Sequence, residues 1–280
     1  MSARERVAPG AFRLGSRFVA SEIGMLLRRR RNQLMLVTLS AIPVIIAIAV
    51  KLTTHNNADG LIGSIADNGI FVAFTALVVV IPIFLPMAVS VVVGESIAGE
   101  AGTGTLRYLL AVPVGRTRLL AVKLIAAAVW CLLTALTVAV VGIVIGLALF
   151  PKGKVTLLSG TQTSMADGVW RLSIVVGYAT VMMLAIAALG LFISTLTEVP
   201  IAAMAATLSL AITMQVLDAV PQLHAIQPWL ISHYLLRFSD VLRDPLSLAG
   251  LQHGLWVALG YVVVFASAAW ARFTSKDVTS

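Results

Sequence analysis

The chain has 280 residues, of which 59% are hydrophobic and only 11% are charged, and its formal net charge is +8 at pH 7. Because a soluble domain has about 25% charged residues, this composition excludes a water-soluble globular domain and indicates an all-α integral membrane protein. The basic residues lie beside apolar runs, which favours the anionic inner leaflet of a lipid bilayer, and not nucleic acid, as their partner.

The first 33 residues predict a cytosolic segment that contains an amphipathic helix in the inner membrane interface. At about 100° per residue, polar and apolar side chains separate onto opposite faces. The polar face carries Arg13, Arg17, Ser21 and Arg28, and the apolar face carries Phe12, Val19, Ile23, Leu26 and Leu27. The block Arg28, Arg29, Arg30 and Arg31 is predicted to anchor the helix to anionic lipid. A plain basic flank before the first span is the alternative.

Six apolar runs predict membrane-spanning helices, because a helix needs about 20 mostly apolar residues to cross a bilayer. They cover residues 34–50, 70–93, 119–150, 172–194, 199–217 and 251–271, within a transmembrane domain over 34–273. Pro82 and Pro86 are expected to kink the second run, since proline removes a backbone donor. With Met87 they are candidates for shaping a transport route; simple kinking is the alternative.

The distribution of Lys and Arg predicts the orientation of these spans. With the N-terminus inside, most basic residues fall in the cytosolic segments, as the positive-inside rule requires. Six spans then place the tail, residues 274–280, in the cytosol as well. We expect Lys123 to mark the inner boundary of the third span.

The stretch GEAGTGTLRYLL, residues 99–110, looks like a phosphate-binding loop of the form G-x-x-x-x-G-T. Such a loop needs a lysine where this chain has Thr105, and it needs a preceding strand where this chain has an apolar span. Glu95 and Glu100 would also repel phosphate. The sequence therefore predicts no nucleotide binding here.

A mechanical role for this stretch is favoured instead. We expect residues 94–118 to form a cytosolic loop in which Gly99, Gly102 and Gly104 turn the chain out of the second span. Residues 105–112 then predict a short helix lying across the inner face, with an apolar side suited to a groove on a cytosolic protein.

Residues 95–123 read E-x-x-x-x-E-x-G-T-G-T-L-R-Y-L-L-x-x-P-V-G-R-x-R-L-L-x-x-K. This pattern resembles the coupling segment of ABC transporter permeases of the type-2 exporter family. Members show an acidic residue, then G-T-L-x-x-L-L, P-[VI]-[SG]-R and a lysine that opens the third span. The resemblance implies contact with a separate ATPase subunit through Glu95, Glu100, Gly104, Thr105, Leu106, Arg107, Leu109, Leu110, Pro113 and Arg116.

The resemblance also implies the remaining partners and the function. The chain would be a non-catalytic permease that forms half of a translocation pathway, together with a second permease copy or paralogue and two ATPase subunits. ATP and magnesium would be bound by the ATPase, and this chain would bind no cofactor. The nearly charge-free spans favour a hydrophobic or amphipathic small molecule as substrate, such as a drug, an antibiotic or a lipid-like compound. The implied location is a bacterial-type plasma membrane.

Two other functions are alternatives. A membrane enzyme acting on lipid would need paired acids, a His/Asp cluster or an activated serine at one depth. An ion-coupled secondary transporter would need ionisable residues near the membrane midplane. The six apolar runs show neither pattern.

The remaining polar residues have both structural and functional interpretations. Gln215 and Asp218, at the outer end of the fifth span, are candidates for a pathway or gating role. Residues 218–247 predict short helices at the outer rim, partly re-entering the membrane. Glu198 suits the start of a helix, with a second ATPase contact as the alternative.

The glycine motif, the single cysteine and the histidines give no indication of a reactive site. Gly142 and Gly146 form a G-x-x-x-G that favours packing within the chain over a dimer seam. Cys131 lies in an apolar run and is expected to be a buried thiol. The four histidines show no zinc-ligand spacing.

Overall fold

The computed structural model describes residues 10–53, 68–103, 116–150, 155–156, 162–242 and 249–275. The long helices are α1 (Gly10–Arg28), α2 (Arg30–Thr53), α4 (Ile70–Val80), α5 (Phe84–Gly102), α7 (Arg116–Leu149), α8 (Met165–Leu196), α9 (Pro200–Asp218) and α11 (Ala249–Ser275). Between α9 and α11 lie the short turns η1 (Pro221–Leu223), η2 (Gln227–Trp229), α10 (Ile231–Tyr234) and η3 (Arg237–Leu242). A small hairpin pairs β1 (Val155–Thr156) antiparallel with β2 (Gln162–Thr163).

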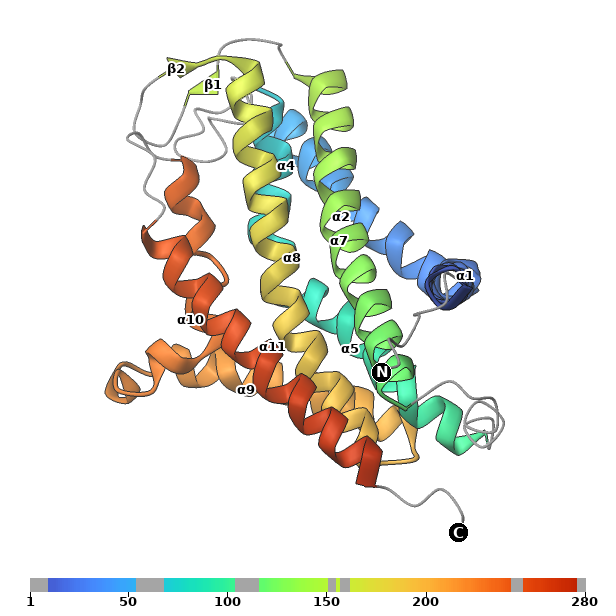
Figure 1. The fold of residues 1–280 in the computed structure, drawn as a ribbon. Coiled ribbons are helices and arrows are strands. Elements are labelled where there is room, and N and C mark those ends of the chain that lie inside the picture. The colour runs from blue at the N-terminus through green and yellow to red at the C-terminus, as the bar shows by residue number, and fades with distance from the viewer. Residues whose placement is uncertain are drawn as a thin grey trace, which may run out of the picture.

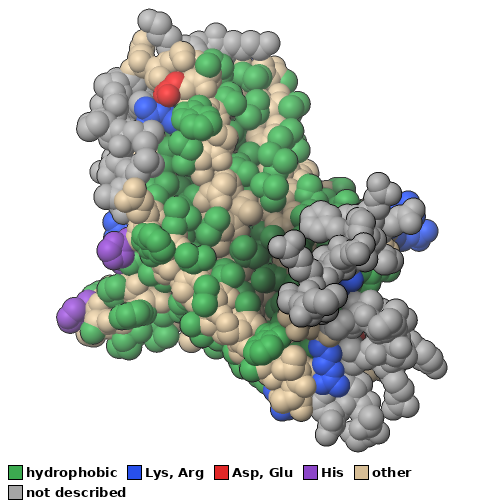
Figure 2. Space-filling view, in the orientation of Figure 1, with side chains coloured by type: hydrophobic (Ala, Val, Ile, Leu, Met, Phe, Trp, Pro, Cys, Tyr) green, Lys and Arg blue, Asp and Glu red, His purple; other side chains and the backbone are tan. Residues whose placement is uncertain are grey.

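Within the described part of the chain, α2, α5, α7, α8, α9 and α11 are long and apolar enough to cross a membrane. This finding confirms a multi-pass, helical membrane protein. With 34 and 32 residues, α7 and α8 are the longest helices described. At about 1.5 Å per residue each measures about 50 Å, which exceeds a hydrocarbon core of about 30 Å. Figure 2 shows hydrophobic side chains over the middle of the visible face and charged side chains toward its ends.

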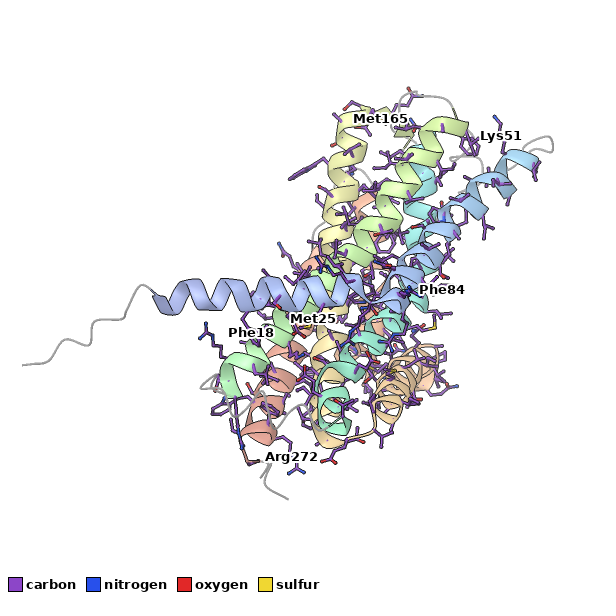
Figure 3. The ribbon with its side chains drawn as sticks, turned by 90° about the vertical axis from the view of Figure 1, so that its right-hand side faces the viewer. Phe18, Met25, Lys51, Phe84, Met165 and Arg272 are labelled. Atoms are coloured by element: carbon purple, nitrogen blue, oxygen red, sulfur yellow. The ribbon has the colours of Figure 1, made fainter. Side chains whose placement is uncertain are left out.

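The bundle has two distinct ends (Figure 1). The hairpin lies at the upper left, and the last turns of α5 and α11 lie at the lower end; α1 lies at the right, at mid-height between the two ends. We call these the hairpin end and the charged end. Figure 3 shows α1 projecting sideways from the bundle, and Lys51 and Met165 at the opposite end from Arg272. Lys51 Nζ ties α2 to α7 at the hairpin end through a 3.0 Å bond to the carbonyl oxygen of Leu149.

The second predicted span is two helices instead of one kinked helix. The chain turns at residues 81–83, so α4 ends before Pro82 and α5 begins after it. Pro82 and Pro86 both lack the N–H that a continuous helix would need. Pro86 leaves the carbonyl of Pro82 without its partner four residues on, and Gln215 Nε2 from α9 donates to that oxygen instead. The break is therefore completed by a distant side chain.

The predicted turn at Gly99 and Gly102 is also wrong, because α5 continues as a helix to Gly102. Gly102, like Gly94 earlier in the helix, serves close packing, whereas a Cβ on Gly99 would make only ordinary van der Waals contacts. A Cβ on Gly102 would lie 2.6 Å from the carbonyl oxygen of Glu198, and one on Gly94 would lie 2.6 Å from Met204 Cγ. Small residues thus let α5 approach α9 and the turn before it.

The G-x-x-x-G of α7 packs within the chain, as predicted. A Cβ on Gly142 would lie 2.6 Å from Ala73 Cα, and one on Gly146 would lie 2.0 Å from the carbonyl oxygen of Gly69. Helix α4 therefore lies against this face of α7 with almost no space between the two backbones.

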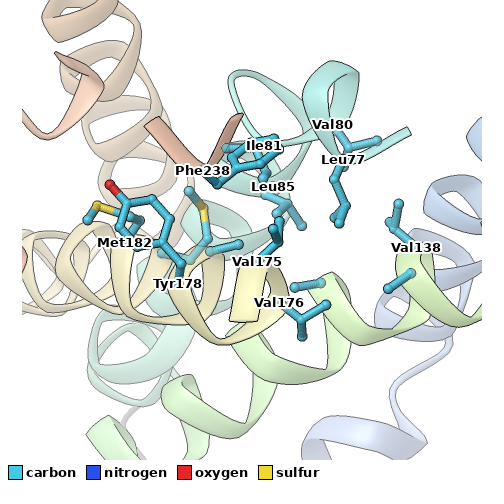
Figure 4. Packing of buried hydrophobic residues seen from close by; sticks show 14 of the residues in the cluster. Leu77, Val80, Ile81, Leu85, Val138, Val175, Val176, Tyr178, Met182 and Phe238 are labelled. Atoms are coloured by element: carbon cyan, nitrogen blue, oxygen red, sulfur yellow. The ribbon is translucent and has the colours of Figure 1, made fainter. Parts of the chain in front are cut away.

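The main core joins α4, α5, α7, α8 and η3 (Figure 4). Leu77 and Leu85 meet Val138 of α7, Val175 and Met182 of α8, and Phe238 of η3 in one buried cluster. Cys131 is a buried free thiol inside it, as expected. The segment between α9 and α11 is helical in short pieces, and Phe238 shows that its apolar side chains enter this core.

Candidate functional site

Six charged side chains from four helices meet at the charged end, and we call them the junction cluster. They are Glu22 of α1, Arg29 and Arg31 at the start of α2, Glu95 and Glu100 of α5, and Lys123 of α7. The cluster links three segments that are far apart in sequence. It therefore fixes α1 and α2 against the end of α5 and the beginning of α7.

Glu95 is held by two arginines. Arg31 Nη1 and Nη2 donate to Glu95 Oε1 and Oε2 at 2.7 and 2.6 Å, which is the bidentate geometry that a guanidinium forms with a carboxylate. Arg29 Nη1 donates to Glu95 Oε2 at 2.6 Å. The side chains of Arg29 and Arg31 are 57% and 41% exposed, so this half of the cluster faces the surroundings.

Lys123 forms the buried half of the cluster. Its side chain is only 5% exposed, and Nζ donates to Glu22 Oε1 at 2.5 Å and to Glu100 Oε1. A buried ammonium is tolerated only when carboxylates offset its lost hydration. Lys123 thus joins α7 to α1 and α5; that it marks the inner boundary of the third span stays a prediction.

Local capping places Arg29 and Arg31. The side-chain amides of Asn32 and Gln33 donate to the carbonyl oxygens of Leu26 and Leu27 at 2.7 and 3.1 Å. These are among the last carbonyls of α1, which have no partner within the helix. The two amides thus close the corner between α1 and α2 and direct the arginines between them toward α5.

A serine from α8 shapes α5 beside the two glutamates. Ser194 Oγ accepts from the backbone N–H groups of Ile97 and Ala98 at 3.1 and 2.9 Å, and donates to the carbonyl oxygen of Gly94 at 2.9 Å. This hydroxyl is inserted into the hydrogen-bond ladder of α5. The backbone between Glu95 and Glu100 is therefore locked to α8.

A cavity of about 630 Å³ opens beside the junction cluster. All six cluster residues line it, together with Arg30 and Asn32 and an apolar wall that includes Met25 and Ala126. The cavity combines acidic, basic and apolar groups. Among the described residues, no group of three or more His, Cys, Asp and Glu side chains could hold a metal ion.

The residues predicted to contact an ATPase divide into two groups. Glu95 and Glu100 belong to the junction cluster, and Arg116 Nη1 donates to the carbonyl oxygens of Phe273 and Thr274 at 3.3 and 2.8 Å, at the end of α11. The others lie outside the described residues; they are Gly104, Thr105, Leu106, Arg107, Leu109, Leu110 and Pro113.

The predicted anchor block is divided as well. Arg29 and Arg31 turn toward Glu95, whereas Arg28 and Arg30 are exposed at the corner between α1 and α2. Half of the block therefore makes contacts within the chain. Binding of the block to lipid stays a prediction.

The residues predicted to line a pathway or gate are placed as follows in the structure. Pro82 and Pro86 produce the break between α4 and α5, which Gln215 completes, and Met87 is exposed on the surface of α5. Asp218 Oδ1 lies 2.8 Å from His233 Nδ1.

His233 also lies beside an arginine. Arg237 Nη2 lies 3.3 Å from His233 Nε2, so the ring sits between a carboxylate and a guanidinium.

Glu198 does not cap α9 as predicted. Helix α9 begins at Pro200 with Val199 as its N-cap, and no side chain caps it. Glu198 lies one residue earlier, where its backbone oxygen meets Gly102.

Sequence reasoning missed the pairing within the junction cluster because the partners are distant along the chain. Two signals were available. Lys123 is a charge inside the apolar run 119–150, and such a charge needs a partner. Glu22 is an acid in a strongly basic segment, next to the apolar residue Ile23.

The fold and the site together define a multi-pass α-helical membrane protein whose charged end is an ion-paired junction of four helices. Residues 24–279 match the family described as Protein of unknown function (DUF2705), and the chain belongs to that family. No curated protein matches the chain.

Proposed function

We propose that this chain is the permease subunit of an ATP-driven exporter, and that a separate ATPase docks on residues 104–115. The observation that carries the proposal is the way both ends of this segment are held. Glu100, near the end of α5, is bound to Lys123, and Arg116, at the start of α7, is bound to the last turn of α11. A segment held firmly at both ends can pass a displacement to the bundle.

The packing of α5 suggests where such a displacement would go. Its glycines leave no space against α9 at Met204 and against the preceding turn at Glu198. Moving the end of α5 would therefore move α9 with it, since packed interfaces shift as units. In this mechanism the ATPase closes on ATP, the docked segment moves, and α5 and α9 open a path outward.

The pathway would form where two permeases meet, along α5 and α9. What supports this arrangement is that most of α9 is not buried within the chain; its exposed side chains include Ile201, Leu210, Ile212 and Val216. An apolar seam suits a hydrophobic or amphipathic small molecule. The complex would contain two such permeases and two ATPase subunits, with both termini of this chain in the cytosol of a bacterial-type cell.

The test is a pair of variants, Leu109→Asp and Leu157→Asp. Both place a carboxylate on a leucine in a connecting segment, but only Leu109 lies in the proposed docking segment. The tagged full-length chain is purified from its native membrane in mild detergent, and magnesium-dependent ATP hydrolysis in the eluate is measured. Burying one leucine contributes about 1.5–3 kcal/mol, so Leu109→Asp should lower the co-purified activity about tenfold or more.

Leu157→Asp should retain the activity of the unaltered protein. ATP hydrolysis by the chain purified free of other proteins would contradict the proposal. Equal activity in the Leu109→Asp and unaltered samples would contradict it as well.

A further inference from the structure

The cavity at the charged end is polar at one side and apolar at the other. The corner between α1 and α2 supplies guanidinium groups, and α5 and α7 supply apolar wall residues such as Val92 and Ala127. Its volume of about 630 Å³ falls in the range of about 300–1,000 Å³ found for small-molecule sites. The cavity therefore suits an amphiphile with a compact polar group.

The charges that line the cavity leave one positive charge in excess. Four cations, Arg29, Arg30, Arg31 and Lys123, face three carboxylates, Glu22, Glu95 and Glu100. The carboxylates are shared among three of the cations, and Arg30 has no ion pair within the described part of the chain. A ligand with a single negative charge would balance the site.

The buried polar atoms at the cavity that lack a hydrogen-bond partner among the described residues include the acceptor Asn32 Oδ1 and the donor Arg31 Nε. Asn32 is only 2% exposed, so the missing bond leaves a desolvated acceptor, which is unfavourable. A ligand that fits must therefore offer a donor as well as an acceptor.

We propose that this cavity binds the headgroup of an anionic glycerophospholipid of the phosphatidylglycerol type. Its phosphodiester carries one negative charge and would accept from Arg30 and Arg31 Nε. Its glycerol hydroxyls would donate to Asn32 Oδ1, and its acyl chains would run along the apolar wall.

Other phosphate compounds fit less well. A phosphoethanolamine headgroup is neutral overall, and a phosphomonoester carries about −1.5 to −2 at pH 7. The position agrees with a lipid, because α1 projects sideways beside the spanning helix α2 (Figure 3). The assignment does not depend on an ATPase partner.

The test is native mass spectrometry of the full-length chain in a nonionic detergent. Phosphatidylglycerol, phosphatidylethanolamine and inorganic phosphate are titrated separately. Phosphatidylglycerol should bind about tenfold more tightly than phosphatidylethanolamine, since hydrogen bonds to charged groups are the strong ones. Inorganic phosphate should neither bind measurably nor displace the lipid.

Two arginines from the same basic block provide the matched variants. Arg30→Gln removes the excess cation that lines the cavity and should weaken phosphatidylglycerol binding about tenfold, whereas Arg28→Gln removes one outside it and should change binding less than about twofold. Ser96→Asp adds a carboxylate to the cavity wall and should also abolish the preference for phosphatidylglycerol, which covers the case that Arg30→Gln does not fold. Circular dichroism and gel filtration check folding.

Three outcomes would overturn the proposal. Equal affinity for phosphatidylglycerol and phosphatidylethanolamine would show that the negative charge of the headgroup does not determine binding. Equal losses in Arg28→Gln and Arg30→Gln would indicate general attraction to a basic surface. Displacement of the lipid by inorganic phosphate would indicate a site for free phosphate.

Discussion

The charged end and the segment between α9 and α11 are held in place by different kinds of interaction. At the charged end, four helices are joined by carboxylates bound to arginines and a lysine. Residues 219–242 are held largely by side chains that donate to backbone carbonyls, beside the contact of His233 with Asp218. These bonds run from Tyr178 to Tyr234 at 2.7 Å, from Ser232 to Met214 at 2.8 Å, from Tyr261 to Trp229 at 2.9 Å and from Arg171 to Val241 at 2.6 Å.

The difference teaches which part of the molecule can respond to its surroundings. Carbonyls of non-helical backbone in an apolar setting need donors, and hydroxyl or guanidinium groups supply them in fixed directions. Such bonds have little dependence on salt. Exposed ion pairs depend on salt and can exchange partners, including with charged lipids or proteins. We therefore expect the charged end to be the adaptable one.

Removing the buried cation should have the largest effect. Lys123→Met leaves Glu22 and Glu100 close together without their shared ammonium. Breaking a buried ion pair costs about 3–5 kcal/mol, so the free energy of unfolding should fall by that order. Denaturant titration in mixed micelles, followed by tryptophan fluorescence, measures it.

Lys51→Met is the control. Lys51 is an exposed lysine near a helix end, and like Lys123 it donates a hydrogen bond to another helix. It should cost less than about 1 kcal/mol. Adding Glu22→Gln and Glu100→Gln to Lys123→Met should restore most of the stability, since no uncompensated charge then remains. If the triple variant is as unstable as Lys123→Met, the loss comes from packing and not from charge.

An intermediate effect is expected at the break between α4 and α5. Gln215→Leu leaves the carbonyl oxygen of Pro82 without the donor that replaces the missing N–H of Pro86. An unsatisfied buried acceptor costs about 1–3 kcal/mol, and because this one is partly buried we expect a cost toward the lower end of that range, the same at low and high salt. The same denaturant titration, run at both salt concentrations, checks this.

Gln252→Leu is the matched control, because Gln252 is exposed on α11. It should leave stability unchanged within about 0.5 kcal/mol. Similar values for the two variants would show that Gln215 contributes nothing as a cap, and its role would have to be sought elsewhere.

The sequence was sufficient to predict that membrane-spanning helices form, and insufficient to predict the contacts that join them. Apolar runs of sufficient length predict spanning helices because a bilayer admits few other structures. The effect of Pro82 and Pro86 was also predictable in kind. Its extent was not predictable, since the break is completed by a distant side chain, Gln215, that donates a hydrogen bond to the freed carbonyl oxygen of Pro82.

The glycines of α5 show the same limit. Gly99 and Gly102 predict a turn as well as they predict close packing, because both need the absence of a side chain. For Gly102, contact with Glu198 across the bundle decides between the two, and it depends on how α5 and α9 cross. In the same way, pairing of Glu95 with Arg31 depends on how the corner between α1 and α2 lies against α5, which no local pattern encodes.

The smallest effect is expected for the exposed half of the junction cluster, and it separates the two kinds of junction most directly. Glu95→Gln keeps the size of the side chain and removes its charge, so Arg29 and Arg31 lose an ion pair but not the packing around it. Exposed pairs contribute about 0–1 kcal/mol, so the free energy of unfolding should fall by less than about 1 kcal/mol at low salt. At about 1 M salt the screening length is about 3 Å, and the difference from the unaltered protein should vanish. Gln215→Leu, whose cost should not change with salt, is measured in the same way and serves as the control. A salt-independent cost for Glu95→Gln would mean that this half of the cluster is as rigid as the segment between α9 and α11. It would contradict the expectation that the charged end is the adaptable part of the molecule.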